Sequence, residues 1–257
     1  MYLADRAGRA LAGFLTRPGT RPLRISTSPP QALLAALQPG DVLLVEGDTR
    51  ISVAIKYLTQ SSWSHAALCI ARPTDPVGVN ANILLEVDVT EGVRVVPLTM
   101  YADVHTRICR PVGLNIDEMR AVIDYATARV GRQYDMKHIW DLARYLLPMP
   151  PVPTRWRRRL LALGSGDPTR AICSTLIAEA YQSVNYPILP EVVLSRNSDI
   201  QAERAYGELR HIQDHGLYMP RDFDVSPYFQ IIKPTLEQGF DPHTRHKLTG
   251  SATNREA

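Results

Sequence analysis

Three residues far apart in the chain carry side chains that together could cleave an acyl bond: Cys173, His65 and Glu86. A thiolate attacks a carbonyl, an imidazole takes the thiol proton and later protonates the leaving group, and a carboxylate orients the imidazole. Cys173 begins the stretch CSTLIAEAY, where the spacing of apolar residues predicts a helix. At a helix start, unpaired backbone N–H groups and the helix dipole favour the thiolate and can hold an oxyanion. The alternative for Cys173 is a small buried apolar side chain.

His65 lies between the polar stretch SSWS and the apolar stretch AALCIA, which is predicted to be a buried strand. A core strand does not need an imidazole at its start, so His65 is the candidate base; a structural histidine at a strand end is the alternative. In ILLEVDV, Glu86 and Asp88 share one face of a second strand. If strands 66–71 and 83–89 pair as a hairpin, His65 lies opposite residue 86 or 87. Glu86 is then the expected partner, and a slip of one residue would favour Asp88.

The order of predicted elements indicates an α+β fold. Residues 40–98 are expected to form an antiparallel meander with one early helix, and 227–233 a last strand. A helix over 115–131 has Asn115 as N-cap, Glu118 as its capping-box partner and Gly131 at its C′ position. Further helices are expected over 170–184 and 198–212. Separate runs of strands and helices are typical of α+β folds rather than of alternating parallel sheets.

Three segments are expected along the chain: a basic N-terminal arm or linker over residues 1–30, one domain over 31–236, and a polar tail over 237–257. The Pro- and Arg-rich stretch of about 138–168 is expected to be an insertion in the domain. The arm has apolar residues at helical spacing and several arginines, and RWRRR at 155–159 is a second basic cluster. The arm either packs on the domain or lies on an anionic membrane surface; the cluster at 155–159 is either a solvated basic surface or a contact for anionic lipid headgroups, which its Trp and the Leu residues beside it favour over nucleic acid.

Composition restricts the class of protein. The 257 residues are 45% hydrophobic and 21% charged, with a net charge of only +3, which predicts an ordinary globular chain and no nucleic-acid partner. Three cysteines do not suggest a disulfide framework. No apolar stretch approaches the ~20 residues of a membrane span, and the N-terminus lacks the apolar block of a secretion signal. We expect a cytoplasmic protein with surface contact to membranes; its oligomeric state is open.

No metal or cofactor is expected. His211 and His215 are four residues apart in HIQDH, but no third ligand accompanies them. His65 and Cys69 are also four apart, and on a strand that spacing separates them by roughly 13 Å. The chain has no Gly-rich phosphate-binding loop.

The sequence resembles the circularly permuted branch of the NlpC/P60 papain-like superfamily, the YiiX/YebB-like cysteine hydrolases. The resemblance covers about residues 38–186 and rests on PGDVLL, WSH, GRQYD and CSTLIAEAY in this order, with looser similarity in PRDFDVSPYFQIIKP. It implies a small antiparallel sheet packed on helices, with Cys173 as nucleophile, His65 as base and then acid, and Glu86 orienting His65. Tyr134 matches a site-lining aromatic position, and Ser64 and Ser174 are expected to line the substrate or oxyanion.

The expected function is that of a cysteine hydrolase or acyltransferase that cleaves an amide, ester or thioester through an acyl-enzyme. Small-molecule, lipid and peptide substrates all remain open. The alternative is a papain-like scaffold that binds a lipid or peptide without turnover. The presence of Cys173, His65 and Glu86 together favours the enzyme, because a degenerate site would usually have lost one of them.

Overall fold

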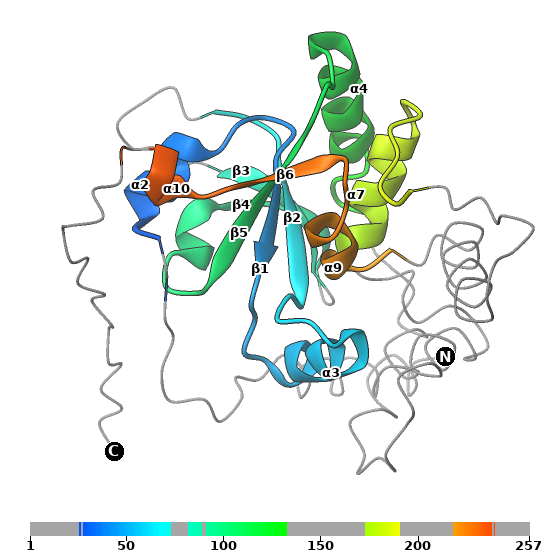
Figure 1. Ribbon diagram of the computed structural model, residues 1–257. Coiled ribbons are helices and arrows are strands. Elements are labelled where there is room, and N and C mark those ends of the chain that lie inside the picture. The colour runs from blue at the N-terminus through cyan, green and yellow to red at the C-terminus, as the bar shows by residue number, and fades with distance from the viewer. Residues whose placement is uncertain are drawn as a thin grey trace, which may run out of the picture.

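The computed structural model describes residues 26, 28–72, 82–88, 91–132, 173–190, 218–237 and 239 (Figure 1). The expected arm over 1–25, Tyr134, the insertion at 138–168, the helix at 198–212 with its two histidines, and the tail beyond residue 239 lie outside them. The domain boundaries at residues 30 and 236 therefore stay predictions.

A six-stranded antiparallel sheet forms the centre of the fold, with the order β4-β3-β2-β1-β5-β6. Its strands are β1 (Val42–Val45), β2 (His65–Cys69), β3 (Asn82–Asp88), β4 (Gly92–Pro97), β5 (Thr106–Pro111) and β6 (Phe229–Ile232). The predicted meander over 40–98 and the last strand are confirmed. Strand β5 was not predicted, because Arg107 and Arg110 interrupt its apolar pattern. Arg110 is accommodated there by two 2.8 Å hydrogen bonds to the buried carboxylate of Asp41.

Helices cover both faces of the sheet, so the fold is α+β as predicted (Figure 1). The described helices are α2 (Pro30–Ala36), α3 (Arg50–Thr59), the short 3₁₀ helix η2 (Leu98–Tyr101), α4 (Ile116–Thr127), α7 (Cys173–Gln182), α9 (Pro220–Asp224) and α10 (Pro234–Glu237). Figure 1 shows α4, α7 and α9 on one side of the sheet and α2 and α10 on the other. Within the described residues, no helix is long and apolar enough to cross a membrane.

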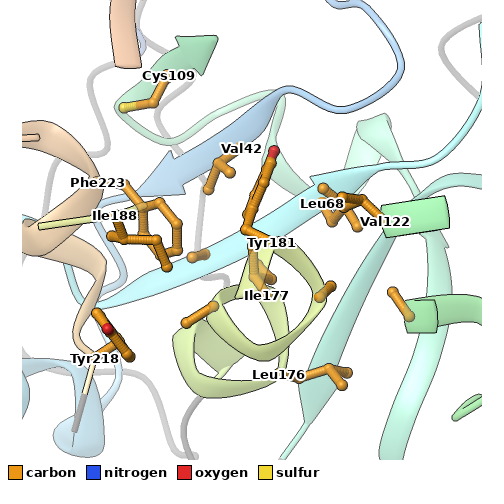
Figure 2. Close-up of a cluster of buried hydrophobic side chains, with 14 of the residues drawn as sticks. Val42, Leu68, Cys109, Val122, Leu176, Ile177, Tyr181, Ile188, Tyr218 and Phe223 are labelled. Carbon is orange, nitrogen blue, oxygen red and sulfur yellow. The ribbon is translucent and has the colours of Figure 1, made fainter. Parts of the chain in front are cut away.

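Two hydrophobic cores result, because successive strand residues point to opposite faces of the sheet. On one face, Val42 and Leu68 join a cluster with Ile177 and Tyr181 of α7, which Figure 2 shows side by side. On the other face, Ala67 and Cys69 join a cluster with residues of α2 and η2. Every strand residue near the site can therefore be assigned to the α7 face or the η2 face.

Helix α4 confirms the predicted start and corrects the predicted end. The Asn115 side chain accepts the backbone N–H of Glu118, and the Glu118 carboxylate accepts that of Asn115. The helix ends at Thr127, so Gly131 is not its C′ residue. The chain continues in tight turns, and Gly131 adopts φ 82° where its N–H donates to the carbonyl of Val93. The apolar spacing of this segment places Ile116 and Val130 on one face with Val122 and Ala126, but Ile116 is 64% and Val130 43% exposed, whereas Val122 and Ala126 are buried.

The capping box gives a direct test of the fold. We expect Asn115→Ala to lower the free energy of unfolding by about 1 kcal/mol, because the alanine cannot accept the Glu118 N–H. Urea unfolding followed by circular dichroism measures this loss. The control is Asn115→Asp, which keeps an acceptor and should stay close to wild type. Equal losses in both variants would contradict a capping function for this side chain.

Candidate active site

The structure brings His65 and Glu86 into contact, as the sequence analysis expected. Nε2 of His65, the first residue of β2, lies 2.7 Å from Oε2 of Glu86 in β3. The Glu86 side chain is only 2% exposed, whereas the imidazole is 23% exposed. A buried carboxylate thus holds a partly accessible ring, which is the relation that an orienting acid and a catalytic base require.

Two further residues, which the sequence analysis did not identify, complete the surroundings of Glu86. Nε of Arg94 in β4 donates to Oε1 at 2.8 Å, and a terminal nitrogen of the same guanidinium forms an ion pair with Oε1 at 2.7 Å. The hydroxyl of Tyr101, the last residue of η2, donates to Oε2. Burial alone would raise the pKa of this carboxyl, but the hydrogen bond and charge of His65 and the hydrogen bonds of Tyr101 and Arg94 lower it to about 2. Glu86 is therefore ionised at neutral pH.

The strand register explains why sequence alone left Glu86 and Asp88 as competitors. Leu68 pairs with Leu85 and Cys69 with Leu84. Continued along the strands, this register places His65 opposite Asp88, so the predicted pairing with residue 86 or 87 is wrong. Glu86 is the diagonal neighbour of His65 on the same face, and its longer side chain reaches the ring. The Asp88 carboxylate lies 3.4 Å from Arg94 and also accepts the backbone N–H of Glu91.

Helix α7 runs beside β2 in the same direction, and its C-terminal half is attached to the Cys69 end of the strand. The hydroxyl of Tyr181 donates to the carbonyl of Gly40, and the N–H of Gly40 donates to the carbonyl of Cys69. Tyr181 and Leu176 are fully buried against the sheet, which confirms the predicted buried face of this helix.

The N-terminal end of α7 is attached at the other end of β2. The hydroxyl of Ser174 donates to the carbonyl of Tyr218 at 2.8 Å, just before α9. At the end of α9, Asp224 accepts the Trp63 indole N–H at 3.0 Å, two residues before His65. Asp224 also accepts from Arg107 at 2.6 Å. The first turn of α7 and the start of β2 thus lie at the same end of the sheet.

Cys173 is the first residue of α7, in the helical first turn where the sequence analysis expected it. Its side chain, like the whole of Tyr134, lies outside what the structure describes. Helix α7 packs on the sheet face that carries Ala66 and Leu68, whereas the ring of His65 lies on the other face, 6.0 Å from the ring of Tyr101. The structure places Cys173 and His65 at one end of the sheet, with the imidazole on the face opposite the helix.

The two serines predicted to line the site make hydrogen bonds to the backbone. Ser64 is buried, and its Oγ accepts the N–H of Gly47 at 2.9 Å. Ser174 is fully buried, with its hydroxyl on Tyr218. These bonds give both hydroxyls a structural function: Ser64 fixes the loop after β1, and Ser174 fixes the start of α7.

The other two cysteines have properties opposite to those of a nucleophile. Cys69 and Cys109 are buried in the sheet and form no disulfide. Burial raises the pKa of the Cys69 thiol to about 12 and raises that of Cys109 as well. Both therefore remain thiols at neutral pH. Within the described residues, no group of three or more His, Cys, Asp or Glu side chains could hold a metal ion.

Comparison with known proteins shows what this chain is similar to. Residues 36–146 match the sequence model of the permuted papain-like amidase enzymes of the YaeF/YiiX type, the C92 peptidase family. The match confirms the predicted resemblance and the permuted papain-like fold; it includes His65 and Glu86 and ends before α7. The chain is also similar to the crystal structure of the metalloprotein yiiX from Escherichia coli O157:H7, with 17% identity over 77% of this chain and 97% of that chain and a TM-score of 0.45. No similar protein is found among the curated ones.

The low pKa of Glu86 predicts a pH-dependent contribution to stability. A carboxyl with a folded pKa of about 2 and an unfolded value near 4.5 stabilises the fold above about pH 5, and this contribution is lost as the pH falls through 2. We expect Glu86→Gln to be less stable than wild type by on the order of 3 kcal/mol at pH 7, and the difference to vanish near pH 2. Urea unfolding between pH 7 and 2 measures it.

The matched control is Asp117→Asn, which removes a carboxylate that is 93% exposed. Its effect should be small at every pH. A stability difference for Glu86→Gln that stays constant from pH 7 to 2 would contradict the lowered pKa.

Proposed function

We propose that this permuted papain-like protein is a cysteine-dependent amidase in which Cys173, His65 and Glu86 perform the chemistry. The observation that carries the proposal is the His65–Glu86 hydrogen bond of 2.7 Å at the end of the sheet where helix α7 begins with Cys173. Amidase activity is the activity of the matched family, and the residue assignments rest on the geometry described above.

The position of Cys173 favours its thiolate. The first turn of an α-helix has backbone N–H groups without intrahelical partners and the positive end of the helix dipole. Cysteines at such positions have pKa values of roughly 3.5–7.5. The same N–H groups can stabilise the oxyanion that forms when the thiolate attacks a carbonyl. Neither Cys69 nor Cys109 has such surroundings.

Glu86 determines which nitrogen of His65 exchanges protons. Because the Glu86 carboxylate is ionised and accepts only, Nε2 of His65 must carry the proton in the 2.7 Å hydrogen bond. In the neutral ring, Nδ1 is then the proton acceptor. We assign to Nδ1 both the removal of the thiol proton and its later delivery.

Helix α7 and the ring of His65 lie on opposite faces of the sheet, so in the proposed site the Cys173 thiol approaches the ring past the end of strand β2. His65 is the first residue of β2 and Cys173 the first of α7, so we assign the thiol a path to the ring around the end of the strand. Trp63, held by Asp224, borders this end on the α7 face. In the proposed site the sulfur of Cys173 therefore contacts Nδ1 of His65 beyond the N-terminal end of β2, next to the loop that contains Trp63.

The reaction proceeds in two displacements. The Cys173 thiolate forms a C–S bond with the amide carbonyl, and the tetrahedral intermediate collapses as the amine leaves with the proton from the His65 imidazolium. A water molecule then loses a proton to Nδ1 while its oxygen attacks the thioester. Release of the carboxylic acid returns the thiol–imidazole pair. An acceptor hydroxyl or amine in place of water would make the protein an acyltransferase, and ester or thioester substrates would follow the same path.

The first prediction concerns the reactivity of the thiol. With iodoacetamide, we expect native Cys173 to react with a midpoint below about pH 7.5, and His65→Gln to move the midpoint towards the ordinary value of about 8.5, because the imidazolium no longer stabilises the thiolate. Cys69 and Cys109 should react only after unfolding. Peptide mass spectrometry across pH measures all three. Equal labelling of the three cysteines in the native protein would contradict an activated Cys173.

The second prediction concerns turnover. Acyl p-nitroanilides with acyl chains from acetyl to decanoyl, and a dipeptide p-nitroanilide, present the same amide with small, lipid-like and peptide-like acyl groups. We expect release of p-nitroaniline and an acyl adduct on Cys173 in the intact mass, and loss of both in Cys173→Ala. Binding of a decanoyl or peptide probe without adduct or turnover would instead support a binding module. Preference for one acyl class identifies the substrate type.

A further inference from the structure

We propose that Arg94 and Tyr101 are positioning residues that hold the Glu86 carboxylate in one orientation and thereby keep His65 in the tautomer with its proton on Nε2. This inference rests on the proposed function for its catalytic meaning. Neither Arg94 nor Tyr101 is among the three residues to which the proposed function assigns the chemistry. Both contact the carboxylate that accepts the Nε2 proton of His65.

Both oxygens of the Glu86 carboxylate are held by neighbouring groups. Oε1 accepts a hydrogen bond from Nε of Arg94 at 2.8 Å and forms an ion pair with a terminal nitrogen of the same guanidinium at 2.7 Å. Oε2 accepts one bond from Nε2 of His65 and one from the Tyr101 hydroxyl. A rotation of the carboxylate would break bonds on both oxygens at once, so its plane is fixed from two sides.

A fixed and ionised carboxylate fixes the proton of the imidazole. The orientation of a histidine ring and its tautomer depend on the acceptor that its second nitrogen meets. If Oε1 lost the fork of Arg94, or Oε2 the hydroxyl of Tyr101, the carboxylate could turn and its hold on Nε2 would weaken. Nδ1 would then carry the proton in part of the molecules, and those molecules could not deprotonate the thiol.

Arg94 also balances charge on the β3–β4 hairpin. Besides Glu86, its guanidinium meets the Asp88 carboxylate at 3.4 Å and that of Glu91 at 3.0 Å. In the part of the chain that the structure describes, the charged groups beside Glu86 are His65 from β2 and Arg94 from β4, with Asp88 and Glu91 behind Arg94; the Tyr101 hydroxyl of η2 also faces it. Without Arg94, three carboxylates would remain close together beside the imidazole. The pKa of the His65 imidazole would then rise, because nearby negative charge stabilises the doubly protonated ring.

The test reads the imidazole directly and needs no substrate. In protein with ¹⁵N-labelled histidine, the two ring-nitrogen shifts of His65 report its tautomer, and their titration reports its pKa. We expect wild type to show neutral His65 with the proton on Nε2. Arg94→Gln should raise the His65 pKa by on the order of one unit, through loss of a nearby cation, and give a mixture of tautomers. Tyr101→Phe should also give the mixture, with a smaller change in pKa.

Two controls separate positioning from general effects. Arg94→Lys keeps the charge but loses the fork, so its His65 pKa should stay near wild type while the tautomers mix. Arg120→Gln removes an exposed arginine paired with Asp117 and should change neither quantity. Thermal unfolding of each variant shows that it is folded. Unchanged tautomer and pKa in folded Arg94→Gln and Tyr101→Phe would overturn the proposal.

Two measurements together distinguish this inference from the proposed function: iodoacetamide labelling of Cys173 in the wild-type protein, and the same histidine spectra in a Cys173→Ala background. If Cys173 alkylates as an ordinary thiol but His65 keeps its tautomer only when Arg94 and Tyr101 are present, the amidase proposal fails and the positioning proposal holds. If p-nitroanilide turnover depends on Cys173, positioning further predicts that Tyr101→Phe lowers kcat roughly tenfold with little change in KM. That loss would be a part of the 10²–10⁴-fold that acid–base catalysis contributes.

Discussion

The site depends on a carboxylate that is almost wholly removed from water. An ionised group at 2% exposure is stable only where donors replace its hydration, and Glu86 has an arginine fork, an imidazole and a phenol around it. These donors come from β4, β2 and η2. The pairing of three strands and the placement of η2 over them are therefore conditions for an ionised Glu86, and through it for an oriented His65.

A second constraint determines where helix α7 can begin. The helix is fixed at its C-terminal half by Tyr181 on Gly40 and at its start by Ser174 on Tyr218. α9 then connects this start to Trp63 through Asp224. With both ends held, the first turn lies at the end of the sheet where β2 starts. Burial of the apolar face of α7 against β2 supplies the stabilising free energy. The polar contacts at the two ends determine the position of the helix along the strand.

Prediction from sequence succeeded where local rules decide the outcome. The capping box of Asn115 and Glu118, the helical start at Cys173 and the strand that begins at His65 each follow from the residues within a few positions. Prediction failed where distant partners decide. Strand β5 was missed because Arg107 and Arg110 look unsuited to a sheet until Asp224 and Asp41 are seen beside them.

Arg94 and Tyr101 were missed for the same reason. In the sequence Arg94 is one charged residue in GVRVVPL, and Tyr101 follows a short turn; nothing local indicates that both reach one carboxylate. Glu86 and Arg94 are directly paired across β3 and β4, and directly opposed residues of a hairpin share a face; the sequence shows this pair only once the strand register is known. The contact of Tyr101 with Glu86 depends on how η2 packs over the sheet.

By itself, the sequence determined the types of side chain available for the chemistry, the order His65, Glu86, Cys173 that indicates a permuted papain-like fold, and most of the local elements. These depend on residue identity and on periodicity within short windows. Only the tertiary structure decided that Glu86 contacts His65 diagonally, that Arg94 and Tyr101 also hold its carboxylate, and that the imidazole lies on the face opposite α7. Strand register and the packing of distant segments decide these features, because a shift of one residue moves every side chain to the other face.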